Sequence, residues 1–183
     1  MDYQFRKAEK KDAWGIWALL QEAIRKRKEE GSNQWQDGYP NLEVIEKDIS
    51  VGIGFVIEVN SKLAGYVAID INNEPAYEVL EGTWVTNGDF VVFHRAAIAK
   101  EFVGKGLATK LFISIENYAK ENGIYSVKAD TNFDNEPMLY LFEKLGYVYC
   151  GQVYFRGSAR RAYEKVLDWL LNTFFKYLLS SFK

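Results

Sequence analysis

Apolar residues recur at the spacing of a helix face in several separate segments. Residues 13–24 place alanine, isoleucine, tryptophan and leucine on one side of an expected helix, which Gly31 ends. A shorter helix fits residues 42–50. A third helix fits the apolar face that runs from Leu107 to Ala119, before Asn122 and Gly123. The pattern therefore predicts three amphipathic helices, each with one face toward a core.

Other segments alternate between apolar and polar residues or are continuously apolar, and these favour strands. The expected strands cover residues 3–8, 53–59, 62–71, 89–98 and 126–130, with one or two more within 147–155. A fourth helix is expected to begin at Pro137 and to end at Gly146. This order of elements predicts a mixed α/β (α+β) domain around one sheet.

The last segment of the chain has a strong apolar pattern of its own. Ser158 is expected to cap a final helix. The apolar face of that helix would hold Val166, Leu167, Leu170, Leu171, Phe174 and Leu178. We therefore divide the chain into a domain, residues 1–157, and a C-terminal helical extension, residues 158–183. Because the face is too apolar for a solvated helix, we expect it to pack on the domain or on the partner subunit of a homodimer.

Composition removes several classes of function. The 183 residues and the net charge of -2 fit one domain and argue against binding to nucleic acid. Cys150 and His94 are the only cysteine and histidine, which argues against a disulfide framework and against a metal site built on these residues. The sequence has neither a leader pattern nor an uncharged apolar run of about 18 residues, so we expect a cytoplasmic protein without a spanning helix.

A loop with two glycines follows the strand at 89–98 and leads into a helix. Backbone amides in such a loop, beside the positive end of the helix dipole, favour a phosphate or pyrophosphate. A P-loop is excluded, because Gly106 stands at its Ser/Thr position and Ala99 at its first glycine. A dinucleotide-binding loop is disfavoured by Thr109 at the third small position and by the mid-chain location.

Two motifs in the chain resemble those of a known family. Residues 101–106, Glu-Phe-Val-Gly-Lys-Gly, resemble the Gln/Arg-x-x-Gly-x-Gly/Ala loop of the GNAT superfamily of acyl-CoA-dependent N-acyltransferases in all but the first residue. Residues 135–147, Asn-Glu-Pro-Met-Leu-Tyr-Leu-Phe-Glu-Lys-Leu-Gly-Tyr, resemble its second motif. The element order agrees from residue 3 to about 156. The resemblance implies a mostly antiparallel sheet flanked by helices, and acetyl transfer from acetyl-CoA to a primary amine of a small molecule or peptide.

The resemblance also implies where acetyl-CoA, the only cofactor expected, would bind. The amides from Val103 to Ala108 would hold its pyrophosphate, and the edge of the strand before the loop would pair with its pantetheine arm. Asn135 would bind the same arm from the far side. The implied cofactor-binding residues are Ala97, Ile98, Ala99, Val103, Gly104, Lys105, Gly106, Leu107, Ala108, Thr109, Asn135 and Phe142. No metal is expected.

Acetylation of an amine needs a base, because an alkylamine is mostly protonated at neutral pH. His94 is the first candidate, since its ordinary pKa is near 6.5 and it lies on the strand that leads to the loop. The alternatives are Asp89, Glu74 and Asp130. Phe142 stands where the family commonly has a tyrosine that protonates the leaving thiolate, and Tyr140 lies on the far side of the helix. This departure also fits a non-catalytic module that only binds a CoA ligand.

The acceptor pocket is expected to come from two loops, residues 31–41 and 72–88. Four aromatic side chains would either line its wall or pin these loops to the domain: Trp35, Tyr39, Tyr77 and Trp84. The carboxylates of Glu74 and Asp37 would attract an amine. The sequence does not indicate which amine is acetylated.

Overall fold

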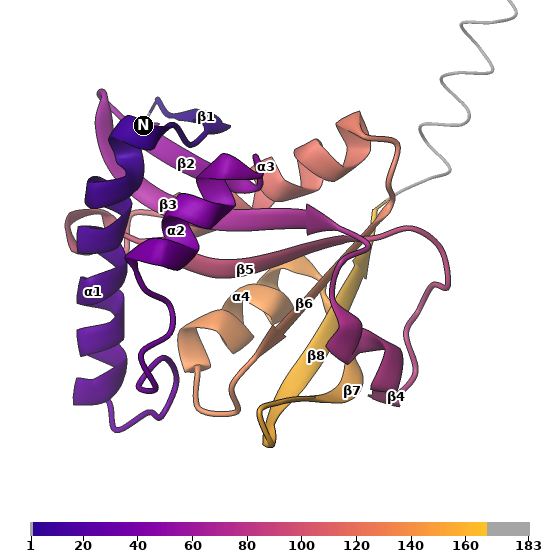
Figure 1. Ribbon diagram of the computed structural model, residues 1–183. Coiled ribbons are helices and arrows are strands. Elements are labelled where there is room, and N and C mark those ends of the chain that lie inside the picture. The colour runs from indigo at the N-terminus through magenta and orange to yellow at the C-terminus, as the bar shows by residue number, and fades with distance from the viewer. Residues whose placement is uncertain (1, 168–183) are drawn as a thin grey trace, which may run out of the picture.

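The computed structural model describes residues 2–167, which form an eight-stranded sheet with helices on both faces (Figure 1). The strands are β1 (Gln4–Lys7), β2 (Gly54–Val59), β3 (Lys62–Ile71), β4 (Glu81–Gly82), β5 (Val91–Ile98), β6 (Ser126–Thr131), β7 (Val148–Phe155) and β8 (Ser158–Val166). The helices are α1 (Ala13–Glu29), α2 (Leu42–Ser50), α3 (Leu107–Glu121) and α4 (Glu136–Leu145). Three short 3-10 helices are η1 (Lys10–Asp12), η2 (Pro75–Val79) and η3 (Lys100–Phe102).

The sheet consists of two antiparallel halves joined by one short parallel pairing. The strand order is β1-β2-β3-β5-β6-β8-β7-β4, and only β5 and β6 run parallel. Their pairing is limited to Val91 opposite Val127 and Val92 opposite Lys128. Beyond that point the two strands diverge, as Figure 1 shows. From Phe93 onward, β5 therefore has a paired edge toward β3 and an unpaired edge toward β6.

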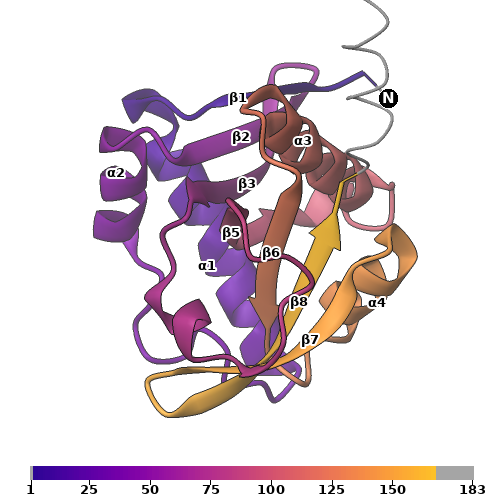
Figure 2. The same cartoon turned by 90° about the vertical axis from the view of Figure 1, so that its right-hand side faces the viewer.

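Each face of the sheet has its own core. On one face, α3 and α4 bring Phe112 and Phe142 against Phe93 of β5. On the other face, α1 and α2 bury Ile16 and Ile45 against the sheet. Figure 2 shows the two helix pairs on opposite sides of the strands. Every helix within residues 2–167 is too short or too polar to cross a bilayer.

The expected helix beginning at Ser158 is wrong for the residues that the structure describes. Ser158–Val166 is β8, a strand inside the sheet between β6 and β7. Its partner β7 runs antiparallel, and Arg156 and Gly157, both at positive φ, make the tight turn of a hairpin. The domain consequently extends past the expected boundary at residue 157. The remainder of the expected extension, residues 168–183, lies outside the described residues.

Segment 72–88 is held on the sheet by a buried carboxylate. Glu164 of β8 has no exposed surface and accepts hydrogen bonds from the backbone amides of Val85 and Thr86 at 2.6 and 3.2 Å. The hydroxyls of Thr86 and Ser126 also donate to it. A buried carboxylate with several donors is well satisfied, so this contact fixes the segment next to β6.

A second attachment of this segment is a close approach of two backbones, and it leads to a test of stability. Gly82 of β4 lies opposite Gly151 of β7, and a Cβ on Gly151, whose φ is +140°, would come 2.2 Å from the Glu81 carbonyl oxygen. We expect Gly151→Ala to lower the free energy of unfolding by about 2–4 kcal/mol, measured by denaturant titration. The control is Gly157→Ala, where a Cβ meets no atom within 4 Å and only the positive φ is penalised. Equal losses in the two variants would contradict the close approach.

Candidate active site

The loop between β5 and α3 presents unpaired backbone amides at a helix N-terminus. Gly104 and Gly106 both have φ +77°, and Gly106 is the N-cap of α3. No acceptor within residues 2–167 binds the amides of Gly104, Gly106, Leu107, Ala108 or Thr109. A Cβ added at either glycine would stand in open space. These free donors beside the positive end of the helix dipole are suited to a pyrophosphate.

The unpaired edge of β5 runs directly into this loop. Ala97 and Ile98 pair with β3 on one side, and no strand pairs with them on the side of β6. At the end of β6, the hydroxyl of Thr131 is buried without a hydrogen-bond partner in the described chain. An extended arm with amide groups could satisfy both, because it would pair with β5 as an added strand does. These features fit the pantetheine arm and the pyrophosphate that the sequence motifs imply.

Asn135 caps α4 and also ties this helix to the loop between α1 and α2. Its Oδ1 accepts from the amide of Met138 at 3.4 Å, and its Nδ2 donates to Oε1 of Gln34 at 3.1 Å. The structure thus gives Asn135 a structural role, as the cap of α4 and as a link to Gln34. Its contact with a pantetheine arm remains a prediction.

Phe142 lies in the aromatic core and not on an open surface. Its ring is fully buried, stacks on Tyr163 at a centroid distance of 4.6 Å and also contacts Tyr147. Tyr140 of the same helix is 63% exposed, as expected for a residue on the other side of α4. Neither residue places a hydroxyl beside the unpaired edge of β5, since phenylalanine has none and Tyr140 faces solvent.

Glu74 of segment 72–88 forms a close pair with His94 of β5. Nε2 of His94 lies 3.2 Å from Oε2 of Glu74, and their side chains are 21% and 14% exposed. Burial lowers the pKa of His94 to about 4, so its imidazole is neutral at pH 7. Burial raises the pKa of Glu74, and the nearby Asp130 carboxylate adds to this rise. Of the two, Glu74 is the stronger proton acceptor near neutral pH.

The other two candidate bases have different surroundings. Asp130 is fixed by the hydroxyl of Tyr77 at 2.9 Å and by Arg160 at 3.1 Å, so its oxygens are engaged. Asp89 is exposed just before β5 and accepts from the side chain of Asn72 at 2.8 Å. The structure therefore brings Asp130 near Glu74 and leaves Asp89 at the surface.

The four aromatic residues expected around the acceptor do not share one wall. Tyr77 and Trp84 pack together, with ring centroids 4.9 Å apart. Trp35 instead packs against the core beneath α1 and α2. Tyr39 receives a hydrogen bond from Arg95 and lies under the guanidinium of Arg156. The single wall expected from all four is therefore wrong: Tyr77 and Trp84 lie together, whereas Trp35 and Tyr39 contact other parts of the domain, which fits the alternative that these aromatics pin their loop.

Asp37, expected to attract an amine, is also engaged elsewhere. Its carboxylate pairs with Arg156 in the turn between β7 and β8. This ion pair links loop 31–41 to the hairpin across 119 residues of sequence. It leaves Glu74 as the better placed of the two carboxylates.

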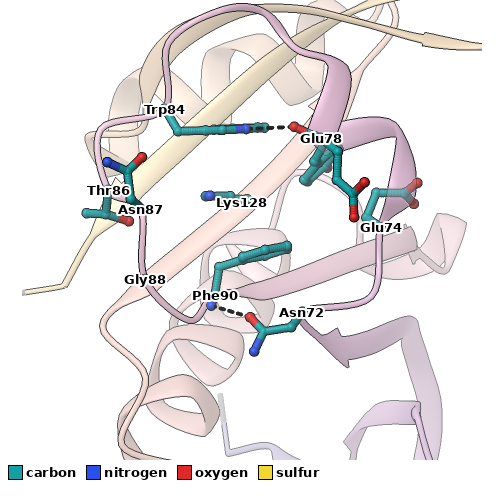
Figure 3. Close-up of a pocket in the computed structure, with 10 residues that line it drawn as sticks. Asn72, Glu74, Glu78, Trp84, Thr86, Asn87, Gly88, Phe90 and Lys128 are labelled. Carbon is teal, nitrogen blue, oxygen red and sulfur yellow. Dashed lines mark hydrogen bonds between the residues drawn. The ribbon is translucent and has the colours of Figure 1, made fainter.

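A cavity of about 250 Å³ is lined in part by Glu74, the partner of His94 (Figure 3). We call it the Lys128 cavity, because Lys128 of β6 lies at its centre in the close-up. Its walls come from segment 72–90, including Glu74, Tyr77, Trp84 and Phe90. The cavity therefore joins the candidate base to the aromatic pair and to a lysine.

Comparison with known proteins agrees with this geometry. Residues 17–147 match the Acetyltransferase (GNAT) family. The chain belongs to the GNAT acetyltransferase family. A GNAT-family acetyltransferase from Streptococcus agalactiae is 35% identical, with a TM-score of 0.85 over 91% of this chain and 96% of that one. These matches agree with the order of strands and helices that the sequence motifs implied.

More distant relatives extend the comparison. An uncharacterized N-acetyltransferase of Methanocaldococcus jannaschii is 28% identical over 96 residues, which is 51% of this chain and only 38% of that protein. The protein yncA of Salmonella typhimurium, solved with its cofactor acetyl-CoA, shares the fold at 19% identity, with a TM-score of 0.64 over 92% of this chain and 95% of that one. Within residues 2–167 this GNAT domain has no group of three or more His, Cys, Asp or Glu side chains that could hold a metal ion.

Three charged residues near the candidate site of this GNAT domain were not predicted from the sequence. Arg160 forms an ion pair with Asp130, Arg95 forms one with Asp48 at 2.9 Å, and Lys128 lines the cavity. Arg160 of β8 was assigned to the expected C-terminal helix. The other two lie inside strands, where a cation among apolar neighbours signals a buried, paired or functional charge. That signal could have marked both residues.

Proposed function

We propose that this protein transfers an acetyl group from acetyl-CoA to a primary amine by direct attack in a ternary complex. One observation carries the proposal. The unpaired edge of β5 connects the loop of free amides at α3 with His94, which lies on the same strand and contacts Glu74. An acyl donor laid along this edge would have its phosphates at the loop and its reactive end toward the buried pair.

The cofactor assignment is supported by family membership and by the chemistry of the loop. The free amides of Gly104 and of residues 106–109 would bind the pyrophosphate, whereas the amides of Val103 and Lys105, also expected there, already donate to the carbonyls of Lys100 and Phe102. The edge of Ala97, Ile98 and Ala99 would pair with the pantetheine amides. The related yncA protein was solved with acetyl-CoA. Lys105 is exposed in the same loop and would add a positive charge near the phosphates.

The His94–Glu74 pair would take up the proton of the amine. Glu74 has a raised pKa, which makes its carboxylate a better general base than an exposed glutamate. His94, neutral at pH 7, would hold the Glu74 carboxylate in place or pass the proton to it. This assignment reverses the order expected from sequence, where His94 came first.

The leaving thiolate would depart without a tyrosine acid. Phe142 is buried in the core and offers no hydroxyl. A thiol has an ordinary pKa near 8.5, so a thiolate is a tolerable leaving group at neutral pH, with water as the eventual proton source. The buried Phe142 also favours the second candidate function, a module that binds a CoA ligand without turnover.

Release of free thiol from acetyl-CoA separates these two functions. The protein is incubated with acetyl-CoA and a panel of primary amines, and thiol is followed with a colorimetric disulfide reagent. Amine-dependent release above the rate without protein is expected. Tight acetyl-CoA binding in calorimetry without release by any amine in the panel would favour the binding module.

A further inference from the structure

Lys128 carries a buried positive charge that the described chain does not neutralise by direct contact. The residue is 4% exposed, and its Nζ lies 4.5 Å from the ring centroid of Trp84 and 4.3 Å from that of Phe90 (Figure 3). Its ammonium makes no ion pair and no hydrogen bond within residues 2–167. A buried charge is costly unless it is paired, and two aromatic faces compensate only part of that cost.

The nearest acidic residue along the sheet is committed to other donors. Glu164 lies opposite Lys128 in the pairing of β6 with β8, but its oxygens bind the amides of Val85 and Thr86. Burial lowers the pKa of Lys128, although Glu164 partly counters this effect. Within the described residues, the ammonium thus has no carboxylate in direct contact.

The Lys128 cavity has opposite charges at separate points of its wall. Lys128 supplies the positive charge, and Glu74 and Glu78 supply negative ones. Its volume of about 250 Å³ is below the range of about 300–1,000 Å³ typical for drug-sized ligands, and it suits a smaller molecule. A ligand with both an amine and a carboxylate would match this arrangement of charges.

The cavity also lies in the right place relative to the candidate base. Lys128 is opposite Val92 of β5. Val92 comes two residues before His94, so the two backbone positions are about 7 Å apart along the strand. Val92 and His94 lie on the same face of β5, because side chains alternate along a strand. A molecule a few carbon atoms long would span from Lys128 to the His94–Glu74 pair.

We infer that the acceptor is a small amino acid, whose carboxylate binds Lys128 and whose amine lies at Glu74. The inference rests on the proposed acetyl transfer and names its substrate class. The ammonium group loses one proton to Glu74, and the neutral nitrogen then forms a bond to the thioester carbonyl carbon and releases its second proton to water. The C–S bond breaks, its electron pair leaves with sulfur, and the proton passes through water to the thiolate. The products are an N-acetyl amino acid and CoA.

The test compares each amino acid with the molecule in which an uncharged carboxamide replaces the carboxylate. Free α-amino acids and straight-chain ω-amino acids are each paired with the corresponding primary carboxamide. Binding is measured by calorimetry on the full-length protein, and transfer is measured by thiol release from acetyl-CoA. For the preferred acceptor, the acid is expected to exceed its amide by about tenfold or more in both affinity and kcat/KM, because only the acid forms a charge-assisted contact with Lys128.

Two variants locate the preference in the cavity. Lys128→Met removes the charge and is expected to abolish the preference for acid over amide, while the exposed Lys120→Met on α3 retains it. Asn87→Asp adds a negative charge at an exposed position of the cavity wall, where folding is undisturbed. Because the added charge opposes only the carboxylate, it is expected to lower the preference for the acid over its amide by about tenfold.

The outcomes separate this inference from the proposed function. If amides are acetylated as well as acids, or if the preference survives both cavity variants, the inference is overturned while acetyl transfer stands. If acids bind in a Lys128-dependent manner but no amine releases thiol, the amino-acid site stands and the proposed transfer fails. Unchanged calorimetric binding of the acids in Lys128→Met would overturn the site itself.

Discussion

Replacing Glu74 with glutamine is expected to lower kcat for amine acetylation by about 10²–10⁴-fold, the usual loss when a general base is removed. Glutamine keeps the size of the side chain but cannot take a proton. His94→Gln is expected to have a smaller effect, because burial already lowers the pKa of His94 to about 4. If the two residues act as a unit, the double variant will lose little more activity than Glu74→Gln alone.

The pH profile gives this prediction a second readout. Because burial raises the pKa of Glu74, activity should fall as the pH drops through that raised value, and Glu74→Gln should lose this acidic limb. Asp89→Asn is the matched control, since Asp89 is exposed and bonded to Asn72. A profile of kcat/KM that is unchanged in Glu74→Gln, together with loss of activity in Asp89→Asn, would move the base to Asp89.

Gly106→Asp is expected to weaken acetyl-CoA binding by more than about tenfold, or about 1.4 kcal/mol, measured by calorimetry. The change places a negative charge at the N-terminus of α3, where the free amides would otherwise meet a pyrophosphate. Aspartate tolerates positive φ better than most residues, so the loop geometry is expected to survive.

The same helix offers a matched control at its other end. Gly123 follows the C-cap of α3, has φ +74° and leaves a new Cβ in open space, as Gly106 does. Gly123→Asp therefore carries a similar backbone penalty without approaching the loop. Equal affinity for acetyl-CoA in the two variants would remove the loop from the cofactor site.

Sequence predicted the elements whose burial pattern is local. The apolar faces of α1, α2 and α3 and the runs that became β2, β3 and β5 were all recognisable, because one side of each helix and both sides of an inner strand are buried. The strand–glycine loop–helix unit was equally local. Its motif gave both the loop and the family.

The C-terminal strand was missed because a neighbouring pattern was stronger. Apolar residues from Val166 onward suggested a helix, and that helix was extended backward to Ser158. The dipeptide Arg156-Gly157 was the competing signal, since two residues at positive φ form the tight turn of a hairpin. A strand inserted between β6 and β7 has hydrogen-bonded neighbours on both sides, which no single-segment pattern reveals.

The site was predictable only where its residues are close in sequence. His94 and Glu74 were both named as candidates, but their contact depends on how segment 72–88 folds back over β5. The attachment that fixes this segment is Glu164, far along the chain in a strand that was assigned to a helix. Pairings across loops of this kind depend on tertiary structure and cannot be read from periodicity.

The short pairing of β5 with β6 is the only strand pairing that joins the two halves of the sheet within the described residues. The pairing is limited to Val91 and Val92, so β5 and β6 are paired at one end and unpaired at the other. A molecule that pairs with the unpaired part of β5 would contact both halves of the sheet and so hold them together, besides reacting there. Ligand that binds only the folded state stabilises it in proportion to the logarithm of its concentration. The concentration of acyl donor would then contribute to the free energy of unfolding of the protein.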